Sequence, residues 1–281
     1  MYQINSKEQS FPIEKGKIAK FTIKGYSRGA YKTGYVIKPY NIYLDAGLQP
    51  VEPANLILLS HCHYDHISSL YIILKEAKQP TMVVSKKSIP RIQLMLESIS
   101  NVTKGKKIFP GWTPIGVENG ECTSFIFKCN NTNIKIYTFP LTHSVECVGY
   151  KIYELRNKLK PEYSDLSGKE LATLRKTTDI HFQQELPILM FVSDTDYKCL
   201  PTLNFNEFNV IIIECTFIEP EHLSEAINRK HIHWSQLEPY IIDNASTIFI
   251  LGHFSCRYKD DYLKKKEVEF KKQHQNIIFW I

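Results

Sequence analysis

The sequence predicts an α/β fold, and two observations carry this prediction. Short apolar runs alternate along the chain with stretches of helical periodicity, which is typical of α/β proteins and not of a helical bundle or an all-β sandwich. No internal repeat or low-complexity tract interrupts the alternation over the 281 residues. We therefore expect a single domain covering residues 1–281.

Apolar runs of strand length predict the strands, and apolar residues at helical spacing predict the helices. The predicted strands are Tyr35 to Leu44, Leu56 to Leu59, Thr81 to Val84, Phe125 to Lys128, Ile134 to Phe139, Ile188 to Val192, Val210 to Ile213 and Ile248 to Leu251. The predicted helices are Ser68 to Lys78, Ile89 to Ser100, Ser167 to Arg175, Leu223 to Arg229, Ser235 to Asp243 and Asp261 to Gln273. Pro239 is expected to kink or shorten the helix that contains it. The polar stretch at about 151–185 is expected to form a short, loop-like arm.

Composition and charge limit the possible functions. The chain is 43% hydrophobic but has no apolar run long enough to span a bilayer, and Met1 to Lys15 lacks the apolar core of a secretory signal. The 7 cysteines are scattered without a CxxC pair, so reduced thiols are expected. We therefore expect a cytoplasmic or nuclear protein without membrane contact. The net charge of +6 is compatible with a polyanionic ligand but does not establish one.

The strongest functional signal is the run SHCHYDH, which directly follows the apolar segment ending at Leu59. Two histidines at i and i+2 in extended backbone point the same way, as zinc ligands must. The chain then turns, so that Asp65 and His66 reach a second ion beside the first. Cys62 lies between His61 and His63, so its side chain is expected to face away from the metals as buried filling.

Further ligand types stand at the ends of three later apolar runs. These residues are His143, Asp194 and His253. Taken singly, each of them would be a turn residue, a helix cap or a surface histidine about as often as a ligand. The recurrence of the same pattern at several strand ends is what favours a shared metal site, because loops at strand ends are where α/β proteins build their sites.

The pattern His-x-His-x-Asp-His, with those three later residues, resembles the signature of the metallo-β-lactamase superfamily. The resemblance implies a four-layer αββα sandwich with a dinuclear site at its mouth. Within that superfamily, the runs HSVECVGY from His143, IECTF from Ile213 and GHFSCRY from Gly252 resemble ribonuclease Z, the tRNA 3′-processing endonuclease, in its short form. The run KPEYSDLSG from Lys160 further resembles the plant-type short enzymes.

Some positions depart from the usual family pattern. Ser68 and Ser69 stand where two glycines are usual, Ser193 replaces a glycine before Asp194, and Ile213 replaces a common histidine. None of these changes removes a ligand. The Gly/Pro-rich arm of many bacterial relatives is also missing, and the shorter Lys151 to Lys176 segment takes its place, which leaves the mode of tRNA docking open.

The resemblance assigns roles to the ligands. His61, His63 and His143 would hold one Zn²⁺, Asp65, His66 and His253 the other, and Asp194 would bridge them; Mn²⁺ is a possible substitute. Asp65 would also orient the attacking hydroxide as a base. Glu214 and His231 match the pair proposed to protonate the departing 3′ oxygen, although a solvated carboxylate and a surface histidine are the plain alternatives, and His233 is a competing donor.

Three more residues receive candidate roles. Ser255 and Arg257, just beyond His253, would contact a substrate phosphate, or would equally well be a capping serine and a salt-bridging arginine. Asp45 resembles a carboxylate that orients a ligand histidine, against the alternative of a simple turn residue.

We therefore expect a zinc-dependent endoribonuclease that removes 3′ trailers from precursor tRNA, and the resemblance implies a homodimer. The arm at Lys151 to Lys176, where basic residues outnumber acidic ones, is the candidate tRNA contact. The main alternative is a small-molecule hydrolase on the same scaffold, such as a thioesterase, lactonase or cyclic-nucleotide phosphodiesterase. A non-catalytic RNA-binding member is a second alternative, disfavoured because all seven ligand positions are filled.

Overall fold

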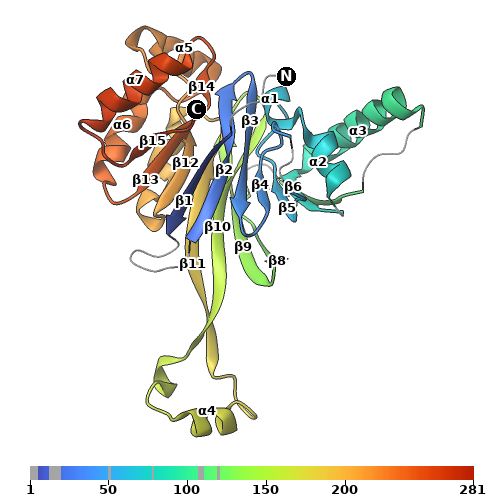
Figure 1. Cartoon of the computed structure of the whole chain (residues 1–281), viewed down its shortest axis with the longest axis vertical. Helices are drawn as coiled ribbons and strands as arrows, with labels where there is room; N and C mark the ends of the chain where they lie inside the picture. The colour runs from blue at the N-terminus through green and yellow to red at the C-terminus, as the bar shows by residue number, and fades with distance from the viewer. Residues whose placement is uncertain (1–5, 13–19, 50–51, 78, 107–110, 119–120) are drawn as a thin grey trace.

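The computed structural model describes residues 6–12, 20–49, 52–77, 79–106, 111–118 and 121–281. Two β-sheets pack face to face, with helices on the outer face of each, so the layers run helix, sheet, sheet, helix (Figure 1). This is the αββα sandwich that the sequence led us to expect. Among the described residues, no helix is both long and apolar enough to cross a bilayer. Most of the Met1 to Lys15 segment lies outside the described residues.

The first sheet has the strand order β1-β2-β3-β4-β5-β6-β7, with β14 added beside β2. Its strands are β1 (Lys7–Pro12), β2 (Lys20–Gly29), β3 (Lys32–Lys38), β4 (Ile42–Leu44), β5 (Leu56–Leu58), β6 (Thr81–Ser85), β7 (Thr113–Val117) and β14 (Phe254–Ser255). Strands β4 to β7 run parallel to one another. The helices α1 (Tyr64–Ile67), α2 (Leu70–Glu76) and α3 (Ile89–Lys104) belong to this half of the sandwich.

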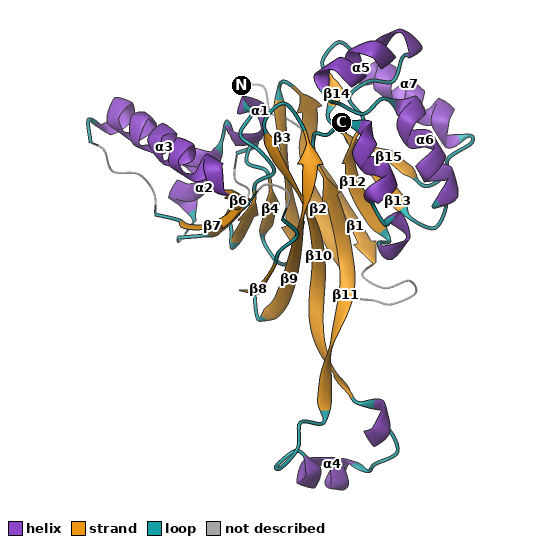
Figure 2. Cartoon of the chain, turned by 180° about the vertical axis from the view of Figure 1, so that it is seen from behind, coloured by secondary structure: helices purple, strands orange, loops and turns teal. Residues whose placement is uncertain are grey.

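The second sheet has the strand order β15-β13-β12-β11-β10-β9-β8. Its strands are β8 (Ser124–Cys129), β9 (Thr132–Thr142), β10 (Glu146–Leu159), β11 (His181–Val192), β12 (Val210–Glu214), β13 (Ile248–Gly252) and β15 (Ile277–Phe279). Strands β11, β12, β13 and β15 are parallel. The helices α5 (Leu223–Arg229), α6 (Trp234–Asp243) and α7 (Asp260–Lys271) lie on its flank (Figure 2).

Three apolar clusters hold these layers together. The central one lies between the sheets and includes Ile37, Tyr150, Phe191 and Trp280, all nearly or fully buried. A second cluster joins the second sheet to α6 and α7, and the third joins the first sheet to α2 and α3. Burial of apolar surface at ~25 cal/mol per Å² is the main term that stabilises such a stack.

Strands β10 and β11 extend far beyond the sandwich as a two-stranded antiparallel ribbon (Figure 1). Its tip carries α4 (Gly168–Leu174), which begins with a capping box between Ser167 and Glu170. Within the stretch at about 151–185 that was expected to form a short, loop-like arm, residues 151–159 and 181–185 belong to β10 and β11, and 160–180 lies outside the strands. Cross-strand pairing over ten register positions orders residues whose polarity suggested a loop.

Several other predicted elements differ from the structure. Tyr35 to Leu44 is two strands, because Pro39 cannot donate to a ladder and Asn41 adopts a φ of 53° in a turn. Pro239 neither ends nor shortens α6, whose Leu237 and Ile241 stay buried on either side of it. The predicted helix end at Lys78 lies outside the described residues. Strands β1, β2, β7, β10, β14 and β15 and the short α1 were not predicted.

Candidate metal centre

The ligand-type side chains all follow the carboxyl ends of strands at one end of the sandwich. Asp45 follows β4, the loop from His61 to His66 follows β5, His143 follows β9, Asp194 follows β11, Glu214 ends β12 and His253 follows β13. Because β4 to β6 and β11 to β13 are two parallel sets whose carboxyl ends meet at this mouth, residues far apart in sequence converge there.

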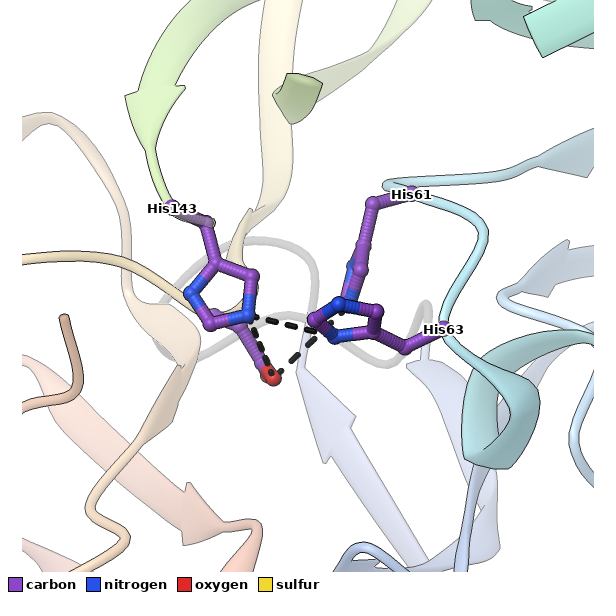
Figure 3. A group of neighbouring side chains, drawn as sticks. His61, His63 and His143 are labelled. Carbon is purple, nitrogen blue, oxygen red and sulfur yellow. Dashed lines mark hydrogen bonds and ion pairs between the residues drawn. The ribbon is translucent and has the colours of Figure 1, made fainter. Parts of the chain in front are cut away.

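One group consists of His61, His63, His143 and Asp194, whose candidate ligand atoms all lie within 4.8 Å of one another. His143 Nε2 is 3.2 Å from His63 Nδ1, and Asp194 Oδ2 is 3.8 Å from both His61 Nε2 and His143 Nε2. The three rings come from two separate loops and turn toward a common point (Figure 3). A tetrahedral shell with bonds of ~2 Å would place its ligand atoms ~3.3 Å apart, close to these separations.

A second group consists of Asp65, His66 and His253, also within 4.8 Å of one another. His253 Nε2 lies 3.3 Å from His66 Nε2 and 3.2 Å from Asp65 Oδ2. Asp194 belongs to both groups in space, because its Oδ2 is 3.3 Å from His253 Nε2 and 3.6 Å from His66 Nε2. A single carboxylate thus stands between two clusters of nitrogen and oxygen donors.

Hydrogen bonds decide which nitrogen each ring presents to the centre. Asp45 is fully buried and its carboxylate can only accept, so His66 donates from Nδ1 at 2.7 Å and keeps Nε2 inward. Ser60 Oγ donates to the same carboxylate at 3.0 Å and therefore accepts from His61 Nδ1 at 2.9 Å. His61 Nε2 is likewise left pointing inward.

The other two rings with an inward Nε2 are held in the same way. His143 Nδ1 donates to the Lys230 carbonyl at 3.1 Å. Thr216 Oγ1 donates to Glu214 at 2.5 Å, so it accepts from His253 Nδ1 at 2.9 Å. His63 is turned the other way, with Nε2 3.3 Å from Ser144 Oγ and Nδ1 toward the centre.

One nitrogen in this cluster has no partner among the described residues. His61 is fully buried, and its Nε2 makes no hydrogen bond although it points at Asp194. An orphaned buried nitrogen costs free energy unless another ligand satisfies it. Together with a donor set of imidazoles and carboxylates, this observation fits the residues to a divalent cation such as zinc.

The electrostatics of the cluster divide the histidines into two kinds. Burial lowers the pKa of His61, His63 and His143, so these rings are neutral at pH 7, the form that coordinates metal. Burial also opposes the charging of His66, but the carboxylates of Asp194 and Asp45 outweigh it and raise its pKa well above 6.5. Burial alone would raise the pKa of Asp194, but the rings of His253 and His66 hold it well below its usual range.

The predicted pair Glu214 and His231 is in contact. His231 Nδ1 donates to Glu214 at 3.0 Å, and its ring stacks on His253 with centroids 5.4 Å apart. Burial lowers the pKa of His231, yet the Glu214 carboxylate dominates and raises it to about 9. His231 therefore carries a proton at neutral pH beside the candidate ligands.

The remaining predicted residues are placed differently. His233 caps α6 and its Nε2 bonds the Glu219 carbonyl at 2.9 Å, so the structure does not bring it into the cluster. Arg257 pairs with Glu225 at 2.8 Å and donates to Ser255 Oγ at 3.2 Å. These contacts match the alternative of a salt-bridging arginine, whereas Ser255 lies in β14 and is not a helix cap, because the N-cap of α7 is Lys259.

No pattern in the sequence pointed to the end of β2 as a support of the centre. Ser27 Oγ accepts from the His253 amide at 2.9 Å, and the Ala30 amide donates to Asp65 Oδ2 at 2.9 Å. Arg28 is buried and donates to the carbonyls of Phe254, Ser255 and Tyr258, which fixes the segment after His253. His253 itself has a φ of 61°, a strained conformation for a non-glycine residue that these contacts hold in place.

The fold and the ligand cluster define the class of this protein. The chain has the metallo-β-lactamase fold: it superposes on the metallo-β-lactamase fold protein YhfI of Bacillus subtilis with a TM-score of 0.56, at 14% identity, covering 90% of this chain and 92% of that one. It also superposes on the short form of human tRNase Z with a TM-score of 0.55, at 13% identity, covering 90% and 93% of the two chains.

Sequence comparison narrows the resemblance to ribonuclease Z. The chain is 26% identical to tRNase Z TRZ1 of Arabidopsis thaliana over 255 residues, which cover 86% of this chain and 88% of the relative. It is 26% identical to the chloroplastic tRNase Z TRZ2 of the same plant over 265 residues, covering 89% and 72%. No protein-family model matches the chain. The expected similarity to plant-type ribonuclease Z is confirmed.

Proposed function

We propose that this protein is a metal-dependent endoribonuclease that removes 3′ trailers from precursor tRNA and leaves a 3′ hydroxyl on the tRNA. The observation that carries the proposal is the contact of Glu214-bound His231 with a complete set of metal-ligand side chains. The ligand set supports phosphodiester hydrolysis, and the relatives named tRNase Z support the substrate.

Two Zn²⁺ ions are the cofactors that suit this donor set, with Mn²⁺ as a substitute. His61, His63 and His143 would hold one ion and Asp65, His66 and His253 the other, while Asp194 reaches both groups. When bound, such a pair lowers the pKa of a water molecule toward neutrality and neutralises charge on the phosphate.

The chain's own residues supply proton transfer and orientation. Asp65 Oδ2 is held by the Ala30 amide and lies 3.2 Å from His253 Nε2, which supports a fixed carboxylate that would orient the attacking hydroxide. In the reaction an oxygen–phosphorus bond forms to water and the bond to the tRNA 3′ oxygen breaks. His231 gives its proton to that departing oxygen, and Glu214 stabilises the imidazolium beforehand. The trailer keeps the phosphate.

The arm is our candidate for the tRNA contact. It projects beyond the body of the sandwich (Figure 2). Its sequence contains Lys158, Lys160, Lys169, Arg175 and Lys176. None of the residues in the tip elements at 161–163 and 168–174 is buried, so the tip contributes to no core. Phosphate contacts from such exposed cations give affinity without sequence preference.

We further propose a single metallo-β-lactamase-fold domain over 1–281 with this arm as its insertion, a homodimer, and a cytoplasmic location. The oligomeric state is measured by light scattering of the purified protein.

The decisive test of function is incubation of the pure protein with a trailer-bearing precursor tRNA, with and without a chelator, followed by mapping of the product ends. We expect chelator-sensitive cleavage near the discriminator base, giving a 3′ hydroxyl on the tRNA and a 5′ phosphate on the trailer. Hydrolysis of acyl thioesters or lactones with no cleavage of the RNA would instead assign a small-molecule hydrolase.

A further inference from the structure

A cavity of about 310 Å³ lies on the far side of the loop that carries His61 and His63. Its lining includes Cys62, Ile67, Arg91, Ile92, Met95 and Val145. These residues come from the ligand loop, from the first half of α3 and from the turn between β9 and β10. The volume lies at the lower end of the range of about 300 to 1,000 Å³ that is typical of small-ligand sites.

The cavity and the metal centre share a wall. Cys62 stands between two candidate ligands, and because successive side chains of an extended segment point to opposite faces, its thiol faces the cavity while the imidazoles face the centre. Val145 lies two residues after His143 in the second ligand loop. The cavity and the site of proposed cleavage are therefore separated only by the backbone of the ligand loops.

The chemistry of the walls is apolar with a cation at one side. Ile67, Ile92 and Met95 are buried or half-buried and belong to the apolar cluster beneath α3. Arg91 is exposed, and among the described residues no carboxylate lies within salt-bridge distance of its guanidinium.

The neighbouring charges at this cavity are already paired. Lys86 bonds Glu118 at 2.5 Å, and Lys87 bonds Glu146 at 2.7 Å. Glu146 also accepts from Ser85, and the positive charge of Arg91 acts on the same carboxylate from beyond ion-pair distance. Arg91 is thus the cation at this cavity whose guanidinium is not held in an ion pair among the described residues, and it suits a ligand that combines an apolar body with negative charge.

We propose that this cavity receives the base of an unpaired nucleotide next to the scissile phosphate, and that Arg91 contacts the base face or its phosphate. The inference rests on the proposed function. Unpaired RNA bases are recognised by packing on apolar or aromatic side chains and on arginine planes, and a single-stranded 3′ trailer presents such a base next to the scissile phosphate.

The test fills the cavity without touching a ligand. Met95→Trp places a large ring in the cavity, and Leu94→Trp is its matched control, because Leu94 is the preceding residue of α3 and is 67% exposed. Arg91→Ala removes the cation at an exposed position. This variant tests the same cavity if Met95→Trp folds poorly. Steady-state kinetics are measured on precursor tRNA and on bis(p-nitrophenyl) phosphate, a phosphodiester without a nucleobase.

We expect Met95→Trp and Arg91→Ala to raise KM for precursor tRNA about tenfold, with hydrolysis of the nitrophenyl ester within about twofold of the wild type, while Leu94→Trp changes neither. Substrates with an abasic site on the tRNA side or on the trailer side of the cleavage point then identify the base, because only one of them should become insensitive to Met95→Trp.

Kinetics of Met95→Trp and Arg91→Ala that equal those of Leu94→Trp on RNA would overturn the subsite, as would an equal loss on both substrates. Failure of the proposed function has a different signature: the wild-type protein would hydrolyse the nitrophenyl ester but would not cleave precursor tRNA at all.

Discussion

The Nδ1 atom of His66 lies 2.7 Å from Oδ2 of Asp45, and both side chains are fully buried. The same carboxylate accepts from the Ser60 amide at 2.7 Å and from the Ser60 hydroxyl that faces His61. Asp45 thereby orients one histidine from each candidate ligand group. A turn residue placed by its backbone alone would make no such contacts, so the geometry favours the orienting role that the sequence suggested.

Asp45→Asn should lower metal affinity about 10- to 100-fold, because asparagine fits the observed φ of 60° but cannot hold both histidines as a carboxylate does. Zinc affinity is measured by competition with a chromogenic chelator. Asp261→Asn, at a side chain that is 92% exposed, is the control and should bind as the wild type does. Equal affinity in both variants would refute the role of Asp45.

His63→Ala and Asp194→Ala should abolish metal retention and cleavage together. His63→Ala removes the Nδ1 atom that lies 3.2 Å from His143 Nε2. Asp194→Ala removes the carboxylate that both candidate ligand groups share. Metal content is measured by mass spectrometry of protein purified without chelator. Retention of two ions per chain by Asp194→Ala would contradict its position between the groups.

His231→Ala should slow cleavage of precursor tRNA about 10²- to 10⁴-fold while leaving the metal content unchanged, since a positioned acid contributes that much and its Nδ1, which lies 4.0 Å from Asp194 Oδ2, is already taken by the hydrogen bond to Glu214. His233→Ala is the matched variant, because His233 caps α6 and lies outside the cluster. If His231→Ala cleaved precursor tRNA at the full rate, or if both variants lost the same factor in cleavage rate, His231 would not be the proton donor.

Glu214 sets the pH range in which His231 can act as an acid. The carboxylate raises the pKa of His231 to about 9, so the protonated donor is present below that pH and is lost as pH rises through it. Glu214→Gln removes the charge, and the alkaline limb of the pH–rate profile should move to lower pH, toward the ordinary histidine range. An unmoved limb would show that another group controls it.

Replacing 161–179 by a short turn should leave the sandwich folded, because none of the residues in the two tip helical elements is buried. We expect a change in Tm of only a few degrees and unchanged metal content, but a higher KM for precursor tRNA. Hydrolysis of bis(p-nitrophenyl) phosphate should not change. An unaltered KM for RNA would exclude the arm as a tRNA contact.

Local patterns were enough to predict the strands and helices with strong periodicity, such as α5, whose bounds match the predicted Leu223 to Arg229. The ligand candidates were visible because each stands at the end of an apolar run. The long ribbon of β10 and β11 was not, because its residues are polar and its order comes from pairing with each other.

The supporting contacts of the centre were beyond the reach of sequence patterns. Ser27, Arg28 and Thr216 are ordinary residues in strands or loops, and only the folded chain brings Ser27 and Thr216 against His253 and Arg28 against the segment after it. Their contribution depends on distances between segments far apart in sequence, which no local pattern encodes.

We propose that seven side chains hold two cations around Asp194. Crystals grown with zinc and measured at the zinc absorption edge would locate the bound ions in an anomalous difference map. We predict two peaks, one within about 2.1 Å of His61 Nε2 and His143 Nε2 and the other within the same distance of His66 Nε2 and His253 Nε2. A map without peaks there, or with zinc bound only elsewhere, would contradict the claim.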